Sequence, residues 1–162
     1  MKFRSKKAFT LVEAAMVMAL TGILAYTVGG FILSSMKIWL LISSRNSLTA
    51  TARFSMNRMV SELKRVNRPE SISLMNTAEC QFTDVNLDPV DFKQSGTNLL
   101  RNDDVLASSL VTPEGLRFTY LDETGAPTGN HLAVCSIRVW LSLSTGDQVT
   151  TLESSARIRN LL

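Results

Sequence analysis

The hydropathy pattern of this chain is dominated by an apolar stretch near its N-terminus. No charged residue lies between Glu13 and Lys37, and apolar side chains in this stretch of 23 residues would point in every direction of a helix. Such a helix would be about 35 Å long, enough to cross a hydrocarbon core of about 30 Å. A helix in a soluble core rarely stays apolar on all sides over this length. The pattern therefore predicts a transmembrane helix.

After the apolar stretch, the pattern becomes that of an amphipathic helix. Glu62 could pair with Arg58 or with Arg65, each about one turn away on such a helix. Pro69 disfavours helical backbone at Arg68, so the helix should stop there. We therefore expect one helix of roughly 55 residues, apolar in its first half and amphipathic in its second. The apolar positions of the second half recur about every 3.5 residues: Leu41, Leu48, Ala52, Met56, Met59, Val60, Leu63 and Val66.

Beyond Pro69, short apolar segments alternate with turn residues, as is typical of antiparallel strands. Residues 86–96 contain a proline and two acids, and they predict a loop. The predicted fold class is α+β, with a long N-terminal helix whose amphipathic half packs on a small antiparallel sheet. In that arrangement the helix face from Leu48 to Leu63 packs on Ile137, Val139 and Leu141. The expected strands are 71–75, 80–85, 98–101, 116–121, 132–143 and 148–159, and residues 144–147 predict a hairpin turn between the last two.

Charge and composition exclude several classes of function. The 17 basic and 14 acidic residues give a net charge of +3, but four of the basic residues lie in the first seven positions. The remainder is nearly neutral, so no nucleic-acid surface is predicted. The single histidine, His131, cannot form a metal cluster by itself. No GxSxG or glycine-rich phosphate loop is present, and we expect no enzymatic activity, no cofactor, no metal and no small-molecule substrate.

Two further features leave alternatives open. Cys80 and Cys135 both follow the predicted span, so they would face an oxidising compartment, where a disulfide between them is the natural expectation. Two free thiols acting as small apolar side chains are the alternative. Asp84, Asp88 and Asp91 lie close together in sequence and could bind calcium, although their spacing does not match an EF-hand. Solvated surface acids are the simpler interpretation.

The residues before the apolar stretch indicate its orientation and its family. Lys2, Arg4, Lys6 and Lys7 precede it, and the positive-inside rule then keeps the N-terminus in the cytoplasm. The segment Lys-Lys-Ala-Phe-Thr-Leu-Val-Glu (6–13), followed by about twenty apolar residues, resembles the prepilin signature of type IV pilins and type II secretion pseudopilins. The resemblance covers about 30 of the 162 residues.

This resemblance implies a processing pathway. A prepilin peptidase would cut between Ala8 and Phe9 and methylate the new N-terminus at Phe9. The family usually has glycine where this chain has Ala8, another small residue. The implied organisation is a leader peptide (1–8), a transmembrane half-helix (9–36), an amphipathic half-helix (37–68) and a β-rich head (69–162).

The resemblance also implies a structural function without catalysis. The chain would be a minor pilin or pseudopilin, with one pass through the inner membrane, a periplasmic head and assembly into a type IV pilus-like filament. Secretion, adhesion and DNA uptake all remain open. Implied partners are prepilin peptidase, other pilin-like subunits, the inner-membrane assembly platform and membrane lipid. In this family Glu13 would pair with the N-terminal amine of a neighbouring subunit. The alternative is an uncleaved, membrane-anchored periplasmic binding module outside any fibre.

Overall fold

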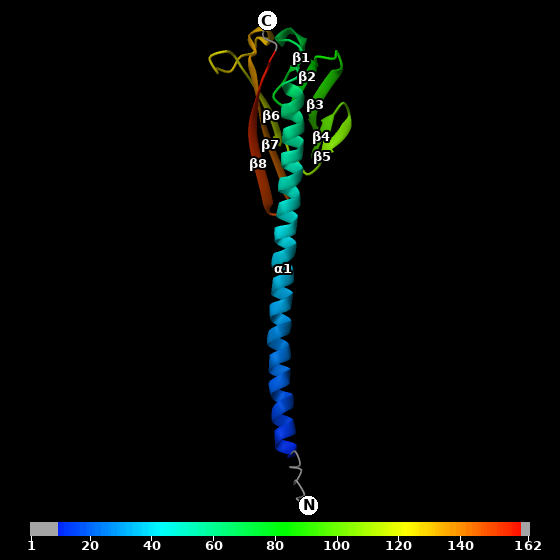
Figure 1. Cartoon of the computed structure of the whole chain (residues 1–162), viewed down its shortest axis with the longest axis vertical. Helices are drawn as coiled ribbons and strands as arrows, with labels where there is room; N and C mark the ends of the chain where they lie inside the picture. Colours follow the sequence, from blue (N-terminus) through cyan, green and yellow to red (C-terminus); the bar gives the residue numbers. More distant parts are fainter. Residues whose placement is uncertain (1–9, 160–162) are drawn as a thin grey trace, which may run out of the picture. The chain divides into compact units, whose positions relative to one another are not determined.

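The structure is a computed structural model, and it describes residues 10–159. One long helix, α1 (Leu11–Leu63), is followed by antiparallel strands, so the α+β class and the order of helix and strands are confirmed (Figure 1). The chain divides into two compact units, Met1–Ser43 and Ser44–Leu162, and α1 contributes residues to both. We call the second unit the head.

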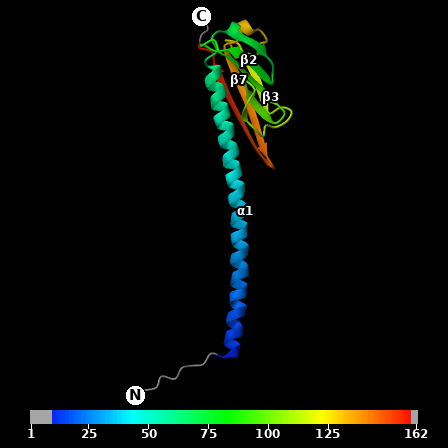
Figure 2. The same cartoon turned by 90° about the vertical axis from the view of Figure 1, so that its right-hand side faces the viewer.

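Within the head, α1 buries one face against the strands. The predicted face is confirmed: Leu48, Ala52, Met56, Met59 and Leu63 are all buried and belong to one apolar core. The same core contains Ile137, Val139 and Leu141, as expected from the sequence. In Figures 1 and 2 the head portion of α1 runs across two sheets that lie side by side.

The helix ends at Leu63, a few residues before the position expected from Pro69. The backbone leaves the helix here because residues 65–67 pair with the end of β2 (Glu79–Thr83) and the residues after it. The amide of Val85 donates to the carbonyl of Arg65 (2.9 Å), and the amide of Asn67 donates to the carbonyl of Thr83 (3.1 Å). Pro69 then begins a short 3-10 helix, η1 (Pro69–Ser71).

The first sheet has five strands in sequential order and includes two strands that the sequence analysis missed. They are β3 (Pro89–Ser95) and β5 (Asp104–Ala107), and the prediction of a loop over residues 86–96 is wrong. In β3, Val90 and Phe92 point into the core while their neighbours are partly exposed. This short alternation of buried and exposed residues was not recognised, because a proline and acidic residues lie within and beside it. The other strands are β1 (Ile72–Met75), β2 and β4 (Asn98–Arg101).

The second sheet has three strands, β6 (Leu116–Leu121), β7 (Ser136–Thr145) and β8 (Gln148–Arg157), in that order. The predicted hairpin between β7 and β8 is confirmed, with ten consecutive residue pairs between Ser136↔Arg157 and Thr145↔Gln148. Its two-residue turn uses Gly146 at φ 57°, a left-handed conformation that glycine adopts without steric cost. β7 starts later than expected because a 3-10 turn, η2 (His131–Ala133), precedes it.

The head therefore contains two sheets, where the sequence analysis expected a single sheet. Loop and side-chain hydrogen bonds join them. The amide of Phe118 in β6 donates to the carbonyl of Thr77 (2.7 Å). Gln94 in β3 accepts from the amide of Leu116 (2.9 Å) and donates to the carbonyl of Val111 (2.9 Å). These bonds satisfy backbone groups where the ladder of one sheet stops and the other begins.

A buried carboxylate ties α1 to the first sheet. Glu62 is 7 % exposed, and both of its oxygens accept from Nε of Arg101 in β4 (2.8 and 2.9 Å). It also pairs with Arg58, as the sequence suggested, whereas Arg65 pairs with Asp84 (2.8 Å). A buried carboxylate is costly unless such partners satisfy it. Arg101 lies 39 residues away in sequence, so this contact depends on the fold.

The predicted disulfide between Cys80 and Cys135 is not formed, because both thiols are free in the structure. Cys80 is the second residue of β2 and is fully buried in the core, close to the hydroxyl of Tyr120. Burial raises the pKa of the Cys80 thiol from 9.0 to about 12. Cys135 precedes β7 in the other sheet and is only half-buried. The two cysteines thus occupy different sheets and different environments.

Candidate functional site

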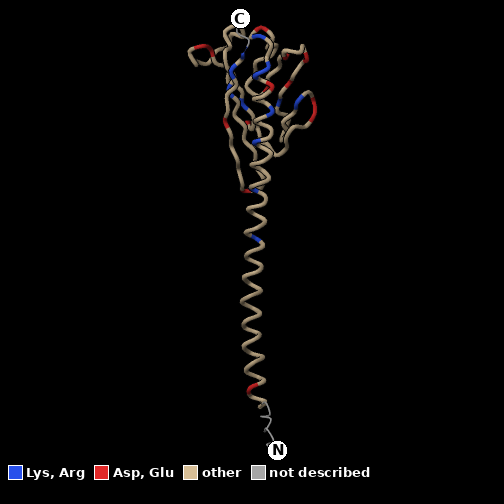
Figure 3. The backbone as a smooth tube through the Cα atoms, in the orientation of Figure 1, with Lys and Arg blue, Asp and Glu red and all other residues tan. Residues whose placement is uncertain are grey.

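The apolar part of α1 is the most unusual surface of the described chain. It is long and apolar enough to cross a membrane, with a mean hydropathy of 2.0 over its most apolar 18 residues, none of which is buried. Glu13 and Lys37 bound this part, and no charged residue lies between them (Figure 3). A core helix of a soluble protein would be mostly covered by its own chain. The exposure is therefore consistent with a membrane anchor.

Glu13 forms a capping box at the start of α1. The backbone amide and the hydroxyl of Thr10 both donate to Oε2 of Glu13 (3.1 Å each). In return, Oγ1 of Thr10 accepts from the amide of Glu13 (3.3 Å). This role was not predicted, although Thr-x-x-Glu before an apolar run is its known signal. The carboxylate also complements the positive end of the helix dipole.

The polar side chains inside the apolar part are satisfied within the helix itself. Oγ1 of Thr21 donates to the carbonyl of Val17 (2.8 Å), and Oγ1 of Thr27 donates to the carbonyl of Leu24 (2.9 Å). In hydrocarbon no water is present to satisfy a hydroxyl, so such internal bonds suit a lipid environment. Gly22 and Gly29 have open space where a Cβ would lie. Nothing in the described chain therefore requires a glycine there.

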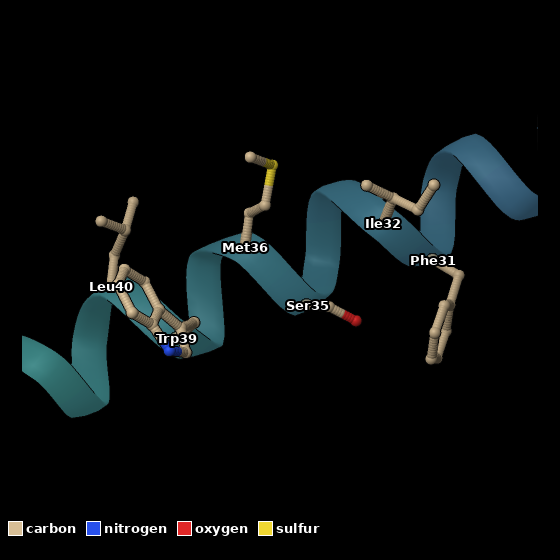
Figure 4. A pocket seen from close by; sticks show the side chains of 6 residues that line it. All are labelled: Phe31, Ile32, Ser35, Met36, Trp39 and Leu40. Atoms are coloured by element: carbon tan, nitrogen blue, oxygen red, sulfur yellow. The ribbon is translucent and has the colours of Figure 1, made fainter.

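The hollows found along the described part of this segment are open to its surroundings. One apolar hollow is lined by Phe31, Ile32, Ser35, Met36, Trp39 and Leu40. Figure 4 shows these side chains spreading outward from consecutive turns of one helix. Such a surface offers no converging polar groups that could orient a small molecule. It can contact lipid tails or another apolar helix.

Two of the three acidic residues considered for calcium, Asp84 and Asp91, are engaged in the fold. Oδ1 of Asp84 accepts from the amides of Asn86 (2.7 Å) and Asp88 (3.1 Å), and its other oxygen binds Arg65. Asp91 lies within β3 and pairs with Lys93 (3.3 Å). In the part of the chain that the structure describes, no three His, Cys, Asp or Glu residues are grouped to hold a metal ion. Asp84 organises the turn that follows β2.

Ala8 and Phe9, the predicted cleavage positions, lie outside the described residues. Thr10 and Glu13 are therefore the only parts of the prepilin-like signature with described side-chain contacts. No protein-family model matches this chain, and no curated protein is significantly similar to it.

Proposed function

We propose that this protein is a minor pilin-like subunit that is anchored in the inner membrane and assembles into a type IV pilus-like filament. Its N-terminus would be cytoplasmic and its head periplasmic. Prepilin peptidase would remove residues 1–8 and methylate Phe9. Other pilin-like subunits and the assembly platform would be its partners. The protein would act through assembly, with no reaction of its own.

The observation that carries this proposal is the exposed apolar helix with an acidic residue in its first turn. A simple anchor does not require Glu13, because a carboxylate near hydrocarbon is costly. Cleavage at Ala8 would place a new amine four residues before this carboxylate. The amine of one subunit could then pair with Glu13 of its neighbour in a medium that screens charge weakly. Pairing would favour association at a defined axial register.

The capping box favours a second candidate, an uncleaved membrane-anchored periplasmic binding module. Glu13 already has Thr10 as a partner, and helix capping alone could explain its presence. A passive anchor would then keep residues 1–8 attached. The two candidates differ in covalent structure and in the need for the charge of Glu13.

Processing is tested by the intact mass of the full chain extracted from membranes. The filament proposal expects loss of residues 1–8 and addition of one methyl group in cells with active prepilin peptidase. A peptidase-deficient strain is the control and should retain the leader. An unchanged full-length mass in both strains would contradict the filament proposal and favour the anchored module.

The role of Glu13 is tested by two variants that separate charge from capping. Glu13→Gln removes the charge, and glutamine can still complete a capping box. Thr10→Ala keeps the charge but removes the cap, at a cost of about 0.5–2 kcal/mol to the helix. Crosslinking to partner subunits in membranes should fall for Glu13→Gln and persist for Thr10→Ala. Equal crosslinking by Glu13→Gln and the parent would rule out an assembly contact.

A further inference from the structure

Within the head, one face of α1 is not covered by the strands. The residues that pack on the core lie on the side of the sheets, and Figure 2 shows the strands to one side of this part of the helix. We call the opposite side the open face, and its middle is formed by Ala50, Phe54, Asn57 and Ser61, all of them exposed. Phe54 is 64 % exposed. The open face therefore presents an aromatic side chain among small and polar ones.

The exposed charges of this portion of the chain are all positive. From residue 44 to residue 68 the chain has one acid, Glu62, and its carboxylate is buried between Arg58 and Arg101. The six basic residues in the same range are all exposed (Figure 3): Arg45, Arg53, Arg58, Lys64, Arg65 and Arg68. The positive charge of the head is thus concentrated along one helix.

The spacing of residues along the open face is that of a seam between two packed helices. Its four middle residues follow one another at intervals of four, three and four positions. Residues at these intervals line up along one side of a helix and meet the corresponding residues of a partner helix. Arg53 and Arg58 occupy the positions that flank this seam, one on each side. Arg58 contacts Glu62 but keeps about half of its side chain exposed (51 %), and a guanidinium has five N–H donors.

The charges at the flanking positions decide which helix can pack here. Flanking side chains of two packed helices face each other, so opposite charges favour pairing and like charges oppose it. A second copy that presented the same face would set arginines against arginines. The whole of α1 contains only two acids, Glu13 and Glu62, so no stretch of it complements Arg53 and Arg58 on both flanks. A helix with acidic flanking positions would do so.

Two other anionic partners fit the open face less well. Residues 44–162 contain 12 basic and 13 acidic residues, so the head as a whole does not attract a polyanion such as nucleic acid. A helix that lies on an anionic membrane inserts a broad apolar face into it. From residue 44 to residue 63, Phe54 is the only exposed large apolar side chain. The apolar side of this helix portion is already buried in the core.

We propose that the open face of α1 is a docking surface for an acidic amphipathic helix of a different protein. Phe54 would pack into the seam of the partner helix, and carboxylates of the partner would pair with Arg53 and Arg58. Apolar contact would supply affinity, and the charge pairs would select the partner. This adds a partner of defined chemistry to the proposed function, and it does not depend on cleavage at Ala8 or on the charge of Glu13.

The test uses the full chain in detergent micelles and a fluorescent synthetic peptide of three heptads. The peptide has leucine at the two seam positions of each heptad and glutamate at the two flanking positions. A matched control peptide has lysine in place of every glutamate, and micelles without protein give the background. We expect saturable binding of the acidic peptide by anisotropy, weakened by salt, and at least tenfold weaker binding of the lysine peptide.

Three protein variants separate the contributions of charge and packing. Arg53→Glu should weaken binding of the acidic peptide about tenfold and strengthen binding of the lysine peptide, because an attractive pair becomes a repulsive one. Arg138→Glu is the matched control: it makes the same change of charge on the side of β7 that faces away from the core, and it should change both affinities by less than twofold. Phe54→Ala keeps the charge and should weaken binding of the acidic peptide about tenfold.

Several outcomes would overturn the proposal. No binding, or equal binding of the two peptides, would show that the arginines are only a solvated surface. Displacement of the acidic peptide by an equal concentration of single-stranded oligonucleotide, or by phosphatidylglycerol added to the micelles, would assign the open face to that anion. Concentration-dependent self-association that excludes the peptide would assign it to a second copy. All of these results would leave the processing test unaffected.

Discussion

Leu63 is the residue whose truncation should show most directly that α1 and the sheets form one cooperative head. Its side chain is completely buried in the core. Leu63→Ala removes three carbons, which corresponds to about 2.4 kcal/mol at about 0.8 kcal/mol per buried CH₂ group. The cavity left behind adds to this, so the total loss in the free energy of unfolding should be about 2.7–5 kcal/mol.

The Cys80 thiol provides an assay that works in the full chain within detergent. It is completely buried, so a thiol reagent reaches it only when the head opens. When reclosing is faster than labelling, the labelling rate is proportional to the open population. A Cys135→Ser background leaves Cys80 as the only thiol. The expected loss of 2.7–5 kcal/mol corresponds to labelling that is roughly 100 to 5,000 times faster.

Val149→Ala is the matched control for this experiment. Val149 is 61 % exposed, so its truncation should change the labelling rate by no more than about twofold. If Leu63→Ala also labels within twofold of the parent, then Leu63 does not stabilise the folded head. That result would refute the packing of the α1 face against the strands.

Three further outcomes are expected. Glu62→Gln should destabilise the head by about 1–3 kcal/mol in the same assay, because it leaves the Arg101 guanidinium without its charged partner; an unchanged rate would contradict this. In the folded parent at pH 8, Cys135 should alkylate much faster than Cys80, whose raised pKa and burial suppress the thiolate; equal rates would contradict the difference in burial between the two thiols. Ala8→Gly should be processed at least as fast as the parent, as measured by intact mass, and slower processing would count against the prepilin-like cleavage.

Local patterns in the sequence were sufficient for the elements with strong periodicity. The apolar run, the amphipathic face from Leu48 to Leu63 and the β7–β8 hairpin were predicted because each depends on residues close in the chain. The Thr10–Glu13 capping box was also readable locally, since the two residues are three positions apart. It was not predicted, because Glu13 was interpreted as a group that pairs with a neighbouring subunit.

Contacts between distant residues decided the rest, and they could not be read from local patterns. β3 pairs with β2 on one side and with β4 on the other, and its side chains Val90 and Phe92 are buried in the core. This pairing and burial outweigh the weak strand propensity of its acids and proline. Glu62 contacts Arg101 because the fold places β4 beside α1. The separation of Cys80 and Cys135 likewise follows from the division into two sheets.

The sequence by itself determined that this chain has a long helix with an unshielded apolar half, because that property needs no partner within the chain. The tertiary structure decided which strand edge remains open. β8 is exposed because β6 and β7 fill the other side of its sheet, while β6 has its own outer side covered by loops. Edge exposure is a property of the whole arrangement of strands, since hydrogen bonding of one strand is set by the neighbours that the fold gives it.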